Sequence, residues 1–312
     1  MRRLHLAPLV LFTALAGLVA FGQESAPPAS GSSPGDASLP DLNTDANGKL
    51  SQGQMQKLLR IVADKDLEND KRLRDYTYIE REEENMLDGK GQVKSTEIKT
   101  YEVMELYGEQ VQRLIEKDDK ALDKKDADKE EEKIQKIIDK RKNESESDRR
   151  KREEKEEKDR EEDRKFVREV ADAYNFTLVG TETLGGREAW VIEGEPRPGF
   201  VPQLKESKYL SKFRGRVWID KNDLQLAKMD VECLDTISWG LFLARFHKGS
   251  RFMLEQTRVN DEVWLPLHVT AKIDARLALL KNFDVNLEET YRDYKKFRAT
   301  ARIVSVGEPQ QK

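Results

Sequence analysis

Alternation of apolar and polar residues dominates the stretch 213–274. The apolar positions fall in five runs, at 217–219, 227–233, 237–246, 250–259 and 263–273. Turn residues such as Asn260 and Asp261 separate these runs. Period-two alternation is typical of strands with one buried and one wet face, and short turns join antiparallel neighbours. We therefore predict an antiparallel sheet with five consecutive segments.

Similar signals recur on both sides of this stretch. Residues 72–86 and 92–106 flank the turn sequence Asp-Gly-Lys-Gly, residues 175–184 and 187–194 flank Gly185 and Gly186, and both patterns predict hairpins. Further strands are expected at 111–115, 284–297 and 299–306, and helices at 54–66 and 205–213. The sequence thus predicts a mainly β (α+β) domain.

Residues 116–165 differ from the rest of the chain, because Glu, Lys, Arg and Asp fill almost every position. Opposite charges recur three and four residues apart, which stabilises a solvated helix. Apolar residues such as Ile134 and Phe166 flank the charged middle. We predict a long charged helical insertion that docks by its ends. A second interpretation is that it binds a partner protein of the cell envelope.

The amino terminus has the pattern of a secretory signal peptide at 1–22. Arg2 and Arg3 precede an apolar run that is shorter than the ~20 residues of a spanning helix, and small residues precede Gln23. We expect a secreted, periplasmic protein without a stable membrane span. Residues 23–53 are expected to be a disordered linker, and 307–312 a disordered tail.

Motifs of catalysis and metal binding are weak. The calcium-like loop at 43–54 has Gln54 where a bidentate Glu is needed. No G-x-S-x-G, H-E-x-x-H, C-x-x-C or phosphate-binding loop occurs, and His268 falls on the polar side of its strand. Cys233, the only cysteine, is expected to be buried and inert. We therefore expect no catalytic residue, cofactor or metal, and not an enzyme.

Composition excludes nucleic acid as a partner. The 56 basic and 60 acidic residues leave a net charge of -4, so no basic excess attracts a polyanion. The aromatic residues are concentrated between 218 and 264, where they either fill the core of a twisted sheet or line a cavity that takes apolar ligands.

Four short motifs carry a family resemblance: GRVWIDK at 215–221, LAKMDVE at 226–232, KGS at 248–250 and VNDEVWLP at 259–266. With the secretory signal, they resemble the periplasmic outer-membrane lipoprotein-sorting (lipoprotein carrier) proteins and their bacterial relatives. The likeness covers about 70–306 and is interrupted by the charged insertion, within a domain expected at 54–306.

This resemblance implies an antiparallel curved sheet that forms an open half-barrel covered by helices. It implies a carrier or binding protein for an apolar ligand such as a lipid, an acyl chain or a lipoprotein. The cargo-gating residues of the carriers match no position here. By position, eight apolar residues are expected to face the ligand cavity: Val217, Ile219, Met229, Val231, Phe252, Leu254, Leu265 and Leu267. The alternatives are an envelope scaffold that docks a partner through 116–165 and, third, an enzyme.

Overall fold

The computed structural model describes residues 50–107, 109–239, 244–277 and 281–296. The predicted signal peptide, most of the linker, the strand at 299–306 and the tail lie outside these ranges. The helical elements are α2 (Gln52–Leu73), α3 (Lys124–Lys142), α4 (Glu146–Ala173) and the 3-10 helix η2 (Ser207–Lys212). The strands are β1 (Tyr76–Leu87), β2 (Val93–Leu106), β3 (Glu109–Lys117), β4 (Lys120–Ala121), β5 (Tyr174–Leu184), β6 (Arg187–Pro196), β7 (Phe213–Asp220), β8 (Leu226–Cys233), β9 (Ile237–Trp239), β10 (Ala244–Phe246), β11 (Arg251–Val259), β12 (Val263–Leu277) and β13 (Lys281–Lys296).

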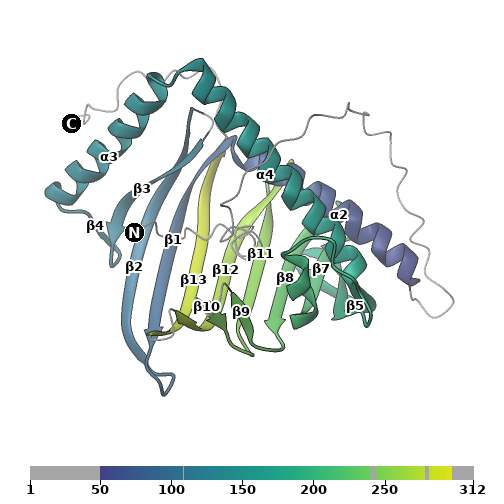
Figure 1. The fold of residues 1–312 in the computed structure, drawn as a ribbon. Coiled ribbons are helices and arrows are strands. Elements are labelled where there is room, and N and C mark those ends of the chain that lie inside the picture. Colours follow the sequence, from purple (N-terminus) through teal and green to yellow (C-terminus); the bar gives the residue numbers. More distant parts are fainter. Residues whose placement is uncertain (1–49, 108, 240–243, 278–280, 297–312) are drawn as a thin grey trace.

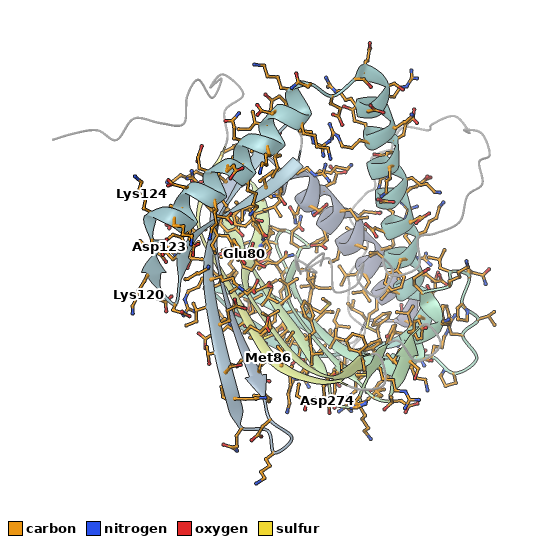
Figure 2. The ribbon with its side chains drawn as sticks, turned by 60° about the vertical axis from the view of Figure 1, so that its left-hand side comes forward. Glu80, Met86, Lys120, Asp123, Lys124 and Asp274 are labelled. Carbon is orange, nitrogen blue, oxygen red and sulfur yellow. The ribbon has the colours of Figure 1, made fainter. Side chains whose placement is uncertain are left out.

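One antiparallel sheet runs in the order β4-β3-β2-β1-β13-β12-β11-β8-β7-β6-β5. The sheet is strongly curved and does not close on itself, and helices lie across its concave side (Figures 1 and 2). This confirms the predicted open half-barrel. The sheet is completed by the pairing of β1 with β13, which brings residues 76–86 beside residues 285–296.

Tight turns with left-handed residues set the strand pairing. Gly185 and Gly186 have φ of 54° and 81° between β5 and β6, and Asn260 and Asp261 have φ of 51° and 57° between β11 and β12. Two successive residues with positive φ match the right-handed twist of antiparallel strands. Both predicted hairpins, β1–β2 and β5–β6, are therefore present, and β11 pairs with β12 across the turn at Asn260 and Asp261.

Helix α2 begins at a capping box, in which the Ser51 hydroxyl accepts from the Gln54 amide and the Gln54 side chain accepts from the Ser51 amide. Its buried stripe includes Met55, Leu58 and Val62. The helix continues to Leu73, beyond the predicted 54–66, because Leu67 and Leu73 extend the same buried stripe. The first strand accordingly begins at Tyr76.

The charged insertion forms two helices, with Asp123 capping α3 and Ser145 capping α4. Ile134 of α3 packs against Leu106 and Val111 of the sheet. Phe166 of α4 joins the main core instead. The two helices diverge over the concave side, α3 toward β3 and α4 alongside α2 (Figure 1).

Two elements differ from the sequence-based prediction. The run 237–246 is not one strand: β9 and β10 pair with each other, and β10 also pairs with β12. The short helix expected at 205–213 is the 3-10 helix η2.

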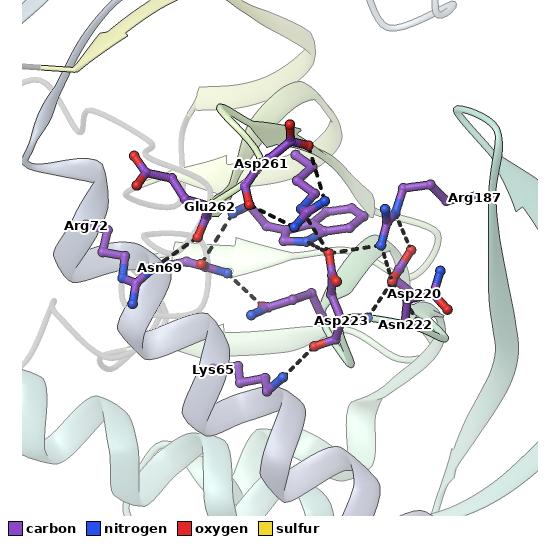
Figure 3. Close-up of polar contacts among 12 residues, drawn as sticks. Lys65, Asn69, Arg72, Arg187, Asp220, Asn222, Asp223, Asp261 and Glu262 are labelled. Atoms are coloured by element: carbon purple, nitrogen blue, oxygen red, sulfur yellow. Dashed lines mark hydrogen bonds and ion pairs between the residues drawn. The ribbon is translucent and has the colours of Figure 1, made fainter. Parts of the chain in front are cut away.

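A polar cluster fastens α2 to the turn between β7 and β8 (Figure 3). The Arg187 guanidinium donates to both oxygens of buried Asp220, at 2.6 and 2.8 Å, and lies 2.9 Å from the Asp223 carboxylate. Asp223 also accepts from the Trp264 indole at 3.0 Å, and its backbone carbonyl accepts from Lys65 of α2. Because charge-assisted hydrogen bonds are directional, they fix the position of α2 on the sheet.

Candidate ligand-binding cavity

A cavity of about 420 Å³ lies between α3 and the strands β1, β2, β3 and β13. We call it the α3 cavity. Six side chains form most of its sheet side: Tyr78, Glu80, Tyr101, Val103, Gln112 and Tyr291. Glu80 points into the space beneath α3 (Figure 2). A volume of this size is within the ~300–1,000 Å³ of ligand sites, and the lining is mostly apolar, as in such sites.

The strand register explains why these side chains share one face. Glu80 lies opposite Tyr101 on one neighbouring strand and opposite Tyr291 on the other. Residues directly opposite in an antiparallel pair point to the same side of the sheet. Gln112 of β3 lies opposite Val103 and extends this face. Three consecutive strands, β1, β2 and β3, and the sequence-distant strand β13 thus build one floor.

Helix α3 forms the opposite wall, through Ile137 and the basic residues Lys133, Lys140 and Arg141. The Lys133 ammonium lies 2.7 Å from the Glu130 carboxylate, and Arg141 lies 2.8 Å from Glu144. These acidic residues of the insertion offset part of the positive charge at the rim. The insertion is therefore structurally part of the site.

One buried carboxyl group, that of Glu80, lies at the floor of the α3 cavity, and a second, that of Glu289, is buried on the neighbouring strand β13. Glu80 is 6% exposed and Glu289 is 1% exposed, and Glu289 lies opposite Glu82 on the adjacent strand. Burial raises the pKa of Glu80 to about 7, and this effect outweighs the hydrogen bond from Gln112, which lowers the pKa. Burial likewise raises the pKa of Glu289 to about 8, while a hydrogen bond from Tyr291 lowers it. Both groups therefore titrate near neutral pH.

Among the described residues, Glu80, Glu82 and Glu289 form a group whose carboxylates are close enough to share a metal ion. Each of Glu80, Glu82 and Glu289 offers an oxygen atom, and these atoms lie within 4.8 Å of one another. Carboxylate oxygens suit hard cations such as Ca²⁺, but ligation requires ionised groups. Protons compete for Glu80 and Glu289 at neutral pH, so a metal would bind there with release of protons.

Tyrosine rings surround the carboxyl groups. The Tyr78 ring lies 5.9 Å from Tyr291 and 5.2 Å from Tyr294, centre to centre. The Tyr291 hydroxyl donates to Glu289 at 2.6 Å, and that of Tyr294 donates to the Pro266 carbonyl at 2.7 Å. Burial raises the pKa of Tyr78 and of Tyr291 well above the ordinary value, so both remain neutral.

The residues expected to face a cavity lie elsewhere, on β7, β8, β11 and β12. Four of them, Ile219, Phe252, Leu254 and Leu265, are buried in the main core. Val217 and Met229 pack against this core, and Val231 is half-buried. None of the eight lines the α3 cavity. At these positions the concave side of the sheet is filled by α2 and α4.

Leu267 departs from the expectation, because its side chain is 44% exposed. A β-bulge explains this: Glu255 pairs with His268 whereas Gln256 pairs with Pro266, so Leu267 is the extra residue. An extra residue in one strand interrupts the alternation of faces. The assignment of Leu267 to the inner face is therefore wrong.

The two histidines of the described domain pair with acids. His247 Nδ1 lies 2.7 Å from Asp274, and His268 Nε2 lies 3.0 Å from Glu288. Cys233 is buried, and its thiol donates to the Asp235 carbonyl at 3.0 Å. Burial raises the pKa of this thiol. The predicted burial of Cys233 is confirmed.

No protein-family model matches the chain, and no curated protein matches it. Solved structures with some likeness include a domain assigned as an outer membrane lipoprotein-sorting protein from Vibrio parahaemolyticus, with 10% identity and a TM-score of 0.32. This match covers 78% of the present chain and 95% of the other. A LolA superfamily protein from Nitrosomonas europaea has 9% identity and a TM-score of 0.29, covering 79% and 94%.

A DUF1329 family protein from Desulfovibrio piger has 12% identity and a TM-score of 0.26, with 80% of this chain and 95% of that chain covered. Within the described part of the chain, no helix combines the length and apolarity needed to cross a membrane.

Proposed function

We propose that this protein is a secreted, periplasmic binding or carrier protein for an apolar ligand, such as a lipid, an acyl chain or a lipoprotein. The ligand would occupy the α3 cavity. The observation that carries this proposal is the cavity itself, about 420 Å³ in volume and lined on the sheet side mainly by aromatic and aliphatic side chains. Burial of apolar ligand surface contributes about 25 cal/mol per Å².

The proposed compartment rests on the signal-peptide pattern at 1–22. An apolar molecule that crosses an aqueous compartment must be shielded from water, and a half-barrel covered by helices supplies such shielding. The resemblance of the four short motifs to the lipoprotein carrier family agrees with this role.

Displacement of a fluorescent fatty-acid probe tests the proposal. Ile137 of α3 lines the cavity, so the larger side chain of Ile137→Trp should occupy part of it. The affinity for the probe should then fall by at least about tenfold. Gln135, exposed on the same helix, supplies the matched control Gln135→Trp, which should bind normally. Equal binding by the two variants, or no probe binding by the wild-type protein, would contradict the proposal and favour the scaffold alternative.

A further inference from the structure

The floor of the α3 cavity holds the Glu80 carboxyl group without a basic partner among the described residues. Gln112 Nε2, the amide donor beside Glu80, is already engaged with this carboxyl at 3.0 Å. Of the residues that the structure describes, no basic side chain pairs with Glu80 or Glu289, whose partners are Gln112 and Tyr291. A buried carboxyl without a counter-charge is costly unless it is protonated or a cation binds it.

Tyr78 provides a second, independent indication of a ligand. The side chain is only 6% exposed and lines the α3 cavity. Its ring contacts Tyr291 and Tyr294, but its hydroxyl has no hydrogen-bond partner among the described residues. Nearly all buried polar groups have a partner, so a hydroxyl left open at a cavity is suited to a ligand.

Tyrosine rings and a carboxylate together suit one chemical group. An ammonium carries only donors, pairs with a carboxylate by charge-assisted hydrogen bonds, and is attracted to aromatic faces. A carboxylate or phosphate would instead meet the field of Glu80, Glu82 and Glu289. Of the three basic residues of the α3 wall, Lys133 and Arg141 are paired with acids of their own insertion, and Lys140 is exposed to solvent.

We propose that the ligand of the α3 cavity bears an organic ammonium group, held at the floor by the Glu80 carboxylate and the side chain of Tyr78. The apolar part of the ligand then extends along Val103 and Ile137. This inference rests on the proposed function, because it names the polar end of the molecule that the cavity carries. The ligand class is an amine-bearing amphiphile.

The test compares three ten-carbon compounds that differ in the polar end group, in competition with the fluorescent probe at concentrations below micelle formation. Decylammonium should bind at least about tenfold more tightly than decanol or decanoate in this competition. The reason is that charge-assisted hydrogen bonds are stronger than neutral ones. Glu80→Gln keeps the shape of the side chain and should remove this preference. The affinity of decanoate for this variant should equal or exceed its affinity for the wild-type protein.

Glu83→Gln is the matched control, because Glu83 lies on the same strand, on the other face, in an ion pair with Arg81. It should leave all three affinities unchanged, and thermal melts establish that both variants are folded. Equal displacement by the three decyl compounds would overturn the ammonium inference alone, whereas displacement by none would contradict the proposed function itself. Displacement of the probe by Ca²⁺ through Glu80, without a preference for decylammonium, would replace this inference by a metal site.

Discussion

Leu265 and Leu267 allow a direct test of how β12 faces the core. The two leucines are two residues apart on one strand, yet Leu265 is 1% exposed and Leu267 is 44% exposed. Truncation of a fully buried leucine to alanine costs about 2–5 kcal/mol, because transfer energy is lost and a cavity remains. Leu267→Ala loses at most about half of a transfer term of ~1.5–3 kcal/mol and leaves no enclosed cavity. Its cost should therefore be at most about 1.5 kcal/mol.

Urea unfolding followed by tryptophan fluorescence measures both variants, since Trp218 and Trp264 are buried and report on the core. Leu265→Ala should lower the midpoint clearly at an unchanged slope, and Leu267→Ala only slightly. Equal losses for the two variants, or a larger loss for Leu267→Ala, would refute the outward position of Leu267 at the bulge.

Three other predictions concern buried polar groups. Glu289 has a pKa of about 8 in the folded protein, above its unfolded value, so its contribution to stability is present below the unfolded pKa and is lost as pH rises through about 8. Glu289→Gln should flatten this fall in melting temperature over a range of roughly pH 5 to 9. An unchanged dependence of melting temperature on pH would show that Glu289 is ionised throughout. Glu169→Ala should cost about 2–4 kcal/mol in chemical denaturation, because the Gln203 and Leu204 amides and the Ser207 hydroxyl lose their acceptor; a loss within experimental error would mean that water replaces the carboxylate. Cys233 should react with a thiol reagent only after denaturant is added, and rapid labelling of the native protein would contradict its burial.

Period-two alternation predicted most strands, because each has one face on the core and one in water. The same rule failed at Leu267, which is exposed at a bulge although Leu265 and Val269 on either side of it are buried. It also merged β9 and β10 into a single strand, since both are apolar; Gly240 within the run is the signal that favours a turn.

The α3 cavity was not predictable from local pattern. Glu80 has the residue type of a solvated strand face, and only the pairing of β1 with β13 brings it against Tyr291 and under α3. Such pairings span more than two hundred residues of sequence. The nearest local signal is Tyr78 beside Glu80 in alternation, with Tyr101 at the matching place across the hairpin.

The role of the aromatic residues between 218 and 264 was left open by the sequence. Trp218, Phe252 and Trp264 are buried, and the α3 cavity is lined by tyrosines of other strands instead. Apolar composition alone does not distinguish a packed interior from an empty one, because both require the same side chains. What decides between them is the course of the covering helices.

Because the half-barrel is open, the sheet has two margins where backbone amides and carbonyls lack a neighbouring strand. Unpaired strand margins invite other chains to add to the sheet and aggregate. At one margin, α3 lies along β3, where Lys133 donates to the Gln112 carbonyl, and at the other, β5 is interrupted by a bulge between Leu178 and Gly180. Both features shorten the template on which a foreign strand could grow. The open sheet thus keeps an accessible interior while its margins disfavour polymerisation.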